Sequence, residues 1–154
     1  MRYLIREMEI DDIMAVIAGE EEIFGTSLGY DMLYSDLVLN PLAHYLVLEI
    51  DDLVEGYIGL WIDENAEVIN FFIRKAYQGM GFGKLLLDFA TNLCKLSGVK
   101  MLSLEVRPSN LKAISLYTQF GFVKSYTRDC YYDDGEDAIV MIKNYEVENE
   151  SIRS

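Results

Sequence analysis

The chain has 154 residues, of which 51% are hydrophobic, and this length suits one globular domain with a real core rather than a disordered chain. No apolar run approaches the ~18 residues that span a bilayer, and the N-terminus lacks a signal-peptide core, so we expect a cytoplasmic protein with no membrane partner. The formal net charge of −13 argues against nucleic acid as a partner; it favours a cationic partner or serves solubility alone.

The first half of the chain predicts a strand, two helices and a β-hairpin. Acidic residues 9–12 suit a helix start, and the apolar residues that follow have helical spacing. The second helix stops before Asn40-Pro41, because the residue before a proline avoids the helical region. The expected elements are a strand at 3–5, helices at 13–24 and 30–39, and strands at 44–50 and 54–61 that pair across Asp51-Asp52.

The second half predicts a central strand, a long helix, a further strand and helix, and a final hairpin. Helical spacing of the apolar residues supports the long helix, which Ser97-Gly98 ends as a glycine cap. The expected elements are strand 68–73, a helix beginning near Lys84, strand 101–107, helix 111–120, and strands 122–132 and 138–143. We expect a single domain over residues 1–144 and a polar tail over residues 145–154.

A glycine-rich turn connects the central strand to the long helix. Gly79, Gly81 and Gly83 permit backbone angles that other residues resist, and Lys84 stands where the helix begins. Unpaired N–H groups at a helix start, beside a lysine, can hold the phosphates of a cofactor. The spacing differs from that of a dinucleotide fold and of a Walker loop. The alternative is an ordinary turn into a core helix.

The remaining candidates for chemistry are few. Cys94 in the long helix and Cys130 in the late strand lack metal-ligand spacing, so we expect two small buried thiols. His44 is the only histidine, which argues against a zinc site or a catalytic triad. Arg107 is expected to stabilise local structure by ion pairing. The sequence therefore predicts no metal.

Two groups of motifs resemble a known family. The segment Gln78–Gly83 resembles the Q/R-x-x-G-x-G/A coenzyme A loop of the GNAT superfamily of N-acetyltransferases. The later motifs L-E-V-R-P-S-N at 104–110, A-I-S-L-Y at 113–117 and E-D-A at 136–138 resemble the RimI family of protein N-terminal acetyltransferases and related archaeal N-alpha-acetyltransferases. The resemblance covers roughly residues 2–144.

This resemblance implies an α/β, three-layer GNAT fold. It has a mixed sheet of about seven strands with helices on both faces, and its fourth and fifth strands splay apart. The implied reaction is direct attack of an amine on acetyl-CoA, with Glu105 as the base and Tyr117 as the acid. Taken alone, Glu105 fits a solvated carboxylate at the end of a strand better than a base, and Tyr117 fits a core aromatic on a helix better than an acid.

The resemblance also implies binding residues. For the cofactor they are Phe71, Phe72, Ile73, Gln78, Gly79, Met80, Gly81, Phe82, Gly83, Lys84 and Asn110; for the acceptor they are Tyr30, Tyr131 and Tyr132. The chain departs from the family pattern at Ile73-Arg74-Lys75, where V-D-P is common, and at Gly25-Thr26, where a proline-tryptophan pair is common. The second departure leaves the acceptor open.

The expected acceptor is the α-amine of a protein, implied by the resemblance to be a ribosomal protein that begins with alanine. The net charge and the acidic segment 133–137 favour a basic peptide. We expect a monomer or a weak homodimer. One alternative is an acetyltransferase for a polyamine, another small amine or a lysine. The other is a non-catalytic acyl-CoA-binding module, against which the presence of both Glu105 and Tyr117 counts.

Overall fold

The computed structural model describes residues 1–146. Its elements are β1 (Tyr3–Glu7), η1 (Ile10–Asp12), α1 (Ile13–Phe24), α2 (Tyr30–Leu39), β2 (Ala43–Ile50), β3 (Leu53–Ile62), β4 (Ala66–Ile73), η2 (Lys75–Tyr77), α3 (Phe82–Leu96), β5 (Met101–Val106), α4 (Leu111–Gln119), β6 (Val123–Arg128) and β7 (Ala138–Asn144). Within these residues no helix combines the length and the apolar character needed to cross a membrane.

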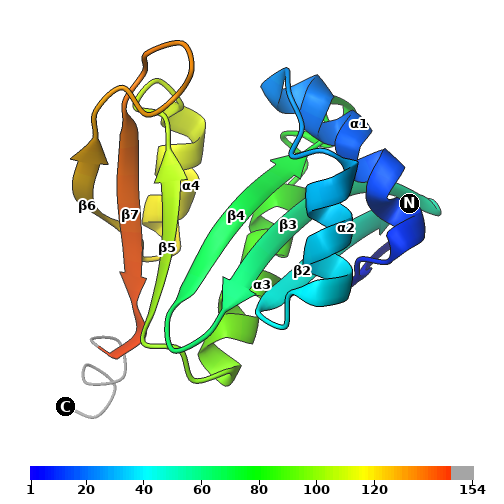
Figure 1. Cartoon of the computed structure of the whole chain (residues 1–154), viewed down its shortest axis with the longest axis horizontal. Helices are drawn as coiled ribbons and strands as arrows, with labels where there is room; N and C mark the ends of the chain where they lie inside the picture. The colour runs from blue at the N-terminus through cyan, green and yellow to red at the C-terminus, as the bar shows by residue number, and fades with distance from the viewer. Residues whose placement is uncertain (147–154) are drawn as a thin grey trace. The chain divides into compact units, whose positions relative to one another are not determined.

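All seven strands belong to one mixed sheet in the order β1-β2-β3-β4-β5-β7-β6 (Figure 1). Strands β4 and β5 run parallel, with Ala66 opposite Leu102 and Glu67 opposite Ser103. The pairs β1–β2, β2–β3, β5–β7 and β6–β7 are antiparallel. The predicted α/β fold with a mixed sheet of about seven strands is confirmed. The splaying of its fourth and fifth strands stays a prediction.

The chain packs as two compact units. We call residues 1–62 and 69–90 the N-terminal unit, and residues 63–68 and 91–146 the C-terminal unit. A single domain over residues 1–144 stays a prediction. Tyr145, which we assigned to the tail, is buried and donates hydrogen bonds from its N–H to the carbonyl of Lys100 (2.9 Å) and from its hydroxyl to that of Thr91 (2.7 Å). The rest of the expected tail, from residue 147, lies outside the described residues.

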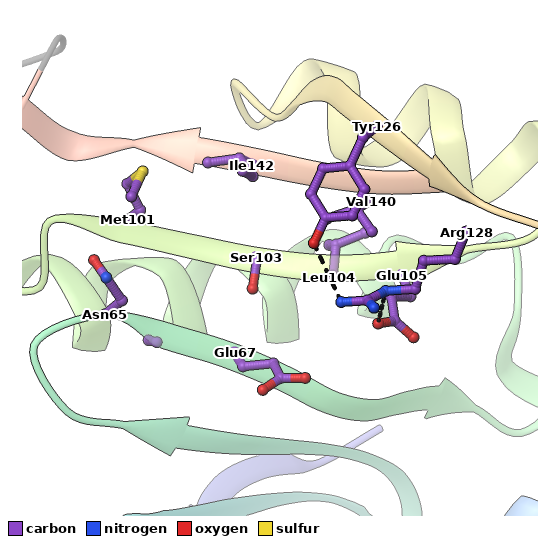
Figure 2. Close-up of a pocket in the computed structure, with 11 residues that line it drawn as sticks. Asn65, Glu67, Met101, Ser103, Leu104, Glu105, Tyr126, Arg128, Val140 and Ile142 are labelled. Carbon is purple, nitrogen blue, oxygen red and sulfur yellow. Dashed lines mark hydrogen bonds and ion pairs between the residues drawn. The ribbon is translucent and has the colours of Figure 1, made fainter. Parts of the chain in front are cut away.

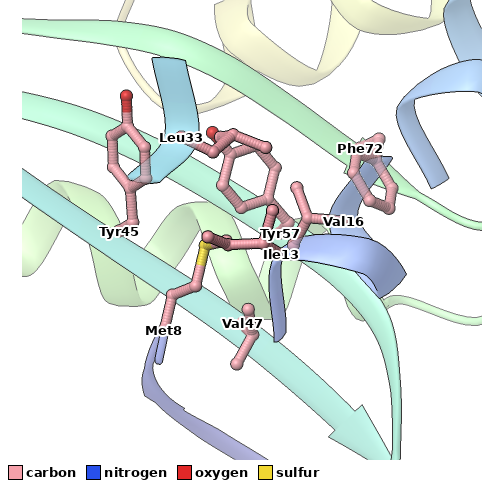
Figure 3. Close-up of a cluster of buried hydrophobic side chains, with 8 residues drawn as sticks. All are labelled: Met8, Ile13, Val16, Leu33, Tyr45, Val47, Tyr57 and Phe72. Carbon is pink, nitrogen blue, oxygen red and sulfur yellow. The ribbon is translucent and has the colours of Figure 1, made fainter. Parts of the chain in front are cut away.

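Helices cover both faces of the strands in the N-terminal unit. Figure 1 shows α1 and α2 in front of β2 and β3, with α3 behind them. Val47 and Tyr57 are opposite each other on β2 and β3, and alternation along each strand sends their neighbours to the α3 side. The buried cluster on the α1 and α2 side, shown in Figure 3, comprises Met8, Ile13, Val16, Leu33, Tyr45, Val47, Tyr57 and Phe72.

The C-terminal unit uses the two faces of its strands differently. Along β5, Leu102, Leu104 and Val106 are buried, whereas Ser103 and Glu105 on the other face are half-buried. Figure 1 shows α4 behind β5 and β7. Tyr117 on α4 and Phe122 are buried together, with ring centroids 5.8 Å apart. The apolar face of β5 is thus covered by α4, the one helix that lies wholly in the described part of the C-terminal unit after β5.

Two predictions about the last hairpin are wrong. The strand expected over residues 122–132 ends at Arg128, and Cys130 is exposed in the following loop instead of buried in a strand. The loop closes on itself through polar groups: the N–H of Cys130 donates to Asp137 Oδ1 (2.9 Å), and the N–H of Tyr132 donates to the carbonyl of Glu136 (3.1 Å). These bonds replace the ladder that a longer hairpin would need, and Cys130 adopts a positive φ of 49°.

Candidate active site

The glycine-rich turn in the N-terminal unit has the backbone of an anion site. Gly79 and Gly81 adopt φ values of 77° and 89°, and a Cβ added at either would meet nothing within 4 Å. The side-chain amide of Gln78 donates to the carbonyl of Ile73 (2.8 Å) and so ties the turn to the end of β4. Helix α3 begins at Phe82, and the N–H groups of its first turn precede the first helical hydrogen bonds. The turn therefore fits the phosphates of a cofactor.

A buried carboxylate on α1 is linked by hydrogen bonds to the predicted cofactor strand. Glu20 on α1 is fully buried; its Oε1 accepts from Ser27 Oγ (2.8 Å) and from the N–H of Leu28 (3.3 Å), and its Oε2 accepts from the side-chain amide of Asn70. Asn70 Oδ1 in turn accepts from the N–H of Phe71 (3.0 Å). Glu20 thus links the α1–α2 loop to β4.

Glu105 lies in a pocket of about 240 Å³ on the open face of the C-terminal unit. The register places Glu67 of β4 opposite Ser103 of β5, and Glu105 follows two residues later on the same face. Figure 2 shows both carboxylates at this pocket with Tyr126 and Arg128 of β6. The pocket is therefore lined by two acids and one guanidinium.

The charges in this pocket act on one another. Arg128 Nε lies 3.1 Å from Glu105 Oε1, and one terminal N–H of Arg128 donates to the Tyr126 hydroxyl (3.2 Å). Partial burial and the nearby Glu105 carboxylate raise the pKa of Glu67, an effect that Arg128 opposes. A hydrogen bond to Glu105, together with burial, raises the pKa of Tyr131 to about 12.

Tyr117 lies on α4, and Asn110 immediately precedes this helix. Tyr117 is buried, and this burial, together with the nearby Tyr132, raises its pKa to about 12. Asn110 is the N-cap of the helix, and its side-chain oxygen accepts from the N–H of Ala113 (3.2 Å). This cap uses the carboxamide oxygen and leaves the amide nitrogen for the predicted cofactor contact.

The predicted acceptor residues lie in two places. Tyr131 and Tyr132 follow β6 in the loop, where their rings pack edge to face with centroids 5.2 Å apart. The Arg107 guanidinium lies 3.9 Å from the centre of the Tyr132 ring and pairs with Asp134 (2.8 Å) and Glu136 (3.0 Å). The ion-pairing role predicted for Arg107 is confirmed.

Tyr30, the third predicted acceptor residue, lies at the start of α2 in the N-terminal unit. It is exposed and stacks on Tyr34, with ring centroids 6.1 Å apart. The two rings are one helical turn apart, as the spacing i, i+4 requires.

Sequence reasoning missed Glu67, Tyr126 and Arg128. Glu67 precedes the expected start of the central strand at residue 68, and the two β6 residues follow no recognised motif. The available signal was strand alternation, which puts Tyr126 and Arg128 on one face of β6. Among residues 1–146 no group of three or more histidine, cysteine, aspartate or glutamate side chains is arranged to hold a metal ion.

Comparison with known proteins gives consistent results. The model of the acetyltransferase (GNAT) family matches residues 10–122. A Bacillus subtilis protein named as a putative [ribosomal protein bS18]-alanine N-acetyltransferase is 41% identical over 139 residues, covering 89% of this chain and 92% of the relative. The crystal structure of the Escherichia coli ribosomal-protein-S18-alanine N-acetyltransferase superposes with a TM-score of 0.85 at 27% identity, covering 93% and 94% of the two chains. That of Ard1 from Thermoplasma volcanium has a TM-score of 0.84 at 24% identity, covering 94% and 98%.

Proposed function

Because this chain belongs to the acetyltransferase (GNAT) family and is an acetyl-CoA-dependent N-acetyltransferase, we propose that its acceptor is the N-terminal α-amine of a ribosomal protein whose first residue is alanine. The names of the Bacillus subtilis and Escherichia coli relatives supply the acceptor. The observation that carries the chemistry is Glu105, a carboxylate that lines an open pocket on the polar face of β5.

In this proposal Glu105 is the base. The amine nitrogen attacks the thioester carbonyl, the carbon–sulfur bond breaks, and Glu105 takes the proton that the nitrogen loses. An α-amine has a reference pKa near 8 against about 10.4 for lysine, so holding it neutral at pH 7 costs roughly 3 kcal/mol less. A carboxylate is therefore an adequate base for an N-terminus.

Tyr117 is the acid, which protonates the departing thiolate. Its pKa of about 12 makes it a weaker acid than a solvated phenol. Against a thiol near 8.5, the transfer is uphill by about 5 kcal/mol, compared with about 2 kcal/mol for an ordinary tyrosine. That cost is well below the ~16 kcal/mol barrier of an enzyme turning over about ten times per second, so Tyr117 suits the role.

Acetyl-CoA is assigned to the predicted cofactor residues. The turn from Gln78 to Lys84 would bind the pyrophosphate through backbone N–H groups, because both glycines with positive φ leave open space beside the chain. Phe71, Phe72 and Ile73 would contribute backbone groups; the side chains of Phe72 and Ile73 are buried in the core and are not available.

A basic acceptor is supported by the net charge more than by the loop 133–137. Arg107 pairs with both Asp134 and Glu136 and compensates one of their two charges, so the loop offers less uncompensated negative charge than its sequence indicates. The charge of −13 over the whole chain still attracts basic peptides at low salt. Raising the salt concentration should weaken binding of a basic peptide more than that of a neutral one.

Mass spectrometry of the reaction products tests the proposal. The substrate is a basic peptide that begins with alanine, has a free α-amine and carries internal lysines; spermidine is offered in a parallel reaction. We expect acetyl groups on the α-amine, and a turnover at least about 10²-fold lower in Glu105→Gln, the usual scale for loss of a general base. Acetylation mainly on lysines, or of spermidine in preference to the peptide, would contradict the assignment.

A further inference from the structure

Arg128 occupies the position beside Glu105 that a cationic substrate would take. Its Nε lies 3.1 Å from Glu105 Oε1, and it is the one ion-pair partner of Glu105 within residues 1–146. Arginine keeps its positive charge at every physiological pH and presents only donors. While this pair is intact, Arg128 occupies Glu105 Oε1, so this oxygen is not free to bind the ammonium group of a substrate.

The pocket has more negative than positive charge. Glu67 and Glu105 both line it, and Arg128 is the one basic residue among its lining residues. One carboxylate therefore stays uncompensated, which favours a second cation. The volume of about 240 Å³ leaves room for the first residue of a peptide and its ammonium group.

Arg128 is held less firmly than Arg107, which also faces carboxylates in the C-terminal unit. Arg107 pairs with two carboxylates and covers the Tyr132 ring at 3.9 Å. Arg128 pairs with one carboxylate, donates to the Tyr126 hydroxyl (3.2 Å), lies 5.5 Å and 6.0 Å from the centres of the Tyr126 and Tyr131 rings, and its side chain is 47% exposed. The Arg128 side chain is half exposed, and ion pairs with an exposed partner contribute little to stability, so an incoming cation can replace Arg128 at small cost.

We propose that Arg128 is a placeholder for the acceptor's ammonium group: it pairs with Glu105 in the acceptor-free enzyme and leaves when a cationic amine enters the pocket. This inference rests on the proposed function. It makes Arg128 a specificity-determining residue, because an acceptor without a cationic amine at this point cannot compete for Glu105. It also keeps the proposed base paired until an acceptor is present.

Nuclear magnetic resonance of arginine side chains tests the exchange directly. The Nε–H signal of Arg128 is assigned as the one that Arg128→Lys removes. The ¹⁵N-labelled enzyme, saturated with coenzyme A so that no turnover occurs, is titrated with the basic alanine peptide and with the same peptide acetylated at its N-terminus. We expect the free-amine peptide to shift the Arg128 signal and the N-acetylated peptide to leave it unchanged.

Calorimetry with two matched variants gives a second measurement. Arg128→Gln and Lys124→Gln each remove one positive charge from β6, but Lys124 does not line the pocket. Relative to Lys124→Gln, Arg128→Gln should bind the free-amine peptide about two- to fivefold more tightly, the effect of one exposed ion pair on an equilibrium. The affinity for the N-acetylated peptide should be the same in both variants.

The outcomes separate this inference from the proposed function. If the peptide binds and is acetylated at its N-terminus but the Arg128 signal does not change, the inference is overturned and the proposed function stands. Equal affinity of the two variants for the free-amine peptide has the same meaning. A peptide that is neither bound nor acetylated overturns both.

Discussion

Replacing Tyr117 by phenylalanine removes the hydroxyl proposed as the acid and keeps the aromatic ring. The ring stays packed against Phe122, at 5.8 Å between centroids, so the fold of the C-terminal unit is kept. Without the phenol the thiolate must take its proton from water or leave unprotonated, and we expect kcat to fall by about 10²-fold or more. The affinity for acetyl-CoA, measured by calorimetry, should change less than twofold.

The raised pKa of Tyr117 also predicts the shape of the pH profile. A group whose pKa is raised to about 12 stays protonated as the pH rises through the range of an ordinary phenol. Between pH 8 and pH 10 the wild-type kcat should therefore show no decrease that depends on Tyr117. Profiles of kcat from pH 6 to pH 10 for wild type and Tyr117→Phe measure this.

Tyr57→Phe is the matched control, because it removes the hydroxyl of another buried tyrosine outside the proposed site. Its kcat should equal that of the wild type. Tyr117 is not the acid if Tyr117→Phe keeps kcat within threefold of wild type. Its pKa is not raised if a wild-type decrease centred near pH 10 disappears in that variant.

Three further predictions concern binding and stability. Gly81→Val and Gly25→Val both place a side chain at positive φ in open space, so each should lower the stability by about 1–2 kcal/mol. Only Gly81→Val should weaken coenzyme A binding more than tenfold, as measured by calorimetry. Equal affinities of the two variants would remove the turn from the site. Asp36→Ala leaves the buried Tyr45 hydroxyl and the N–H of the half-buried Trp61 without their acceptor, and it should cost about 2–4 kcal/mol in urea unfolding. A cost below about 1 kcal/mol would show that the site relaxes. Tyr57→Phe deletes a buried hydroxyl that lacks a hydrogen bond of ordinary geometry, so it should raise stability by roughly 1 kcal/mol. A loss of stability in the same assay would reveal a partner for that hydroxyl.

Local patterns in the sequence were sufficient for most of the elements. The second helix has the predicted bounds, Tyr30–Leu39, because a loop before it and Asn40-Pro41 after it limit it on both sides. Alternation along residues 101–107 correctly predicted that Leu102, Leu104 and Val106 are buried and that Glu105 lies on the polar face. These features depend on neighbours a few residues away, which a sequence displays directly.

Features that depend on distant pairing were not predictable in this way. Glu67 lies near Glu105 because β4 pairs with β5 in parallel. Arg128 lies beside Glu105 because β6 pairs with β7 and β7 pairs with β5. The early end of β6 has a similar origin. Residues 129–132 have the composition of a strand, but the side chain of Asp137 and the loop backbone bind their polar groups.

The exposure of Cys130 gives this protein a reporter group. The chain has two cysteines; the other, Cys94, is buried in α3, and its burial raises the pKa of its thiol to about 12. Because only a thiolate attacks a maleimide, a dye added near neutral pH will attach to Cys130 and spare Cys94. The label then lies in the loop after β6, one residue before Tyr131, so the unmodified sequence can report peptide docking by fluorescence.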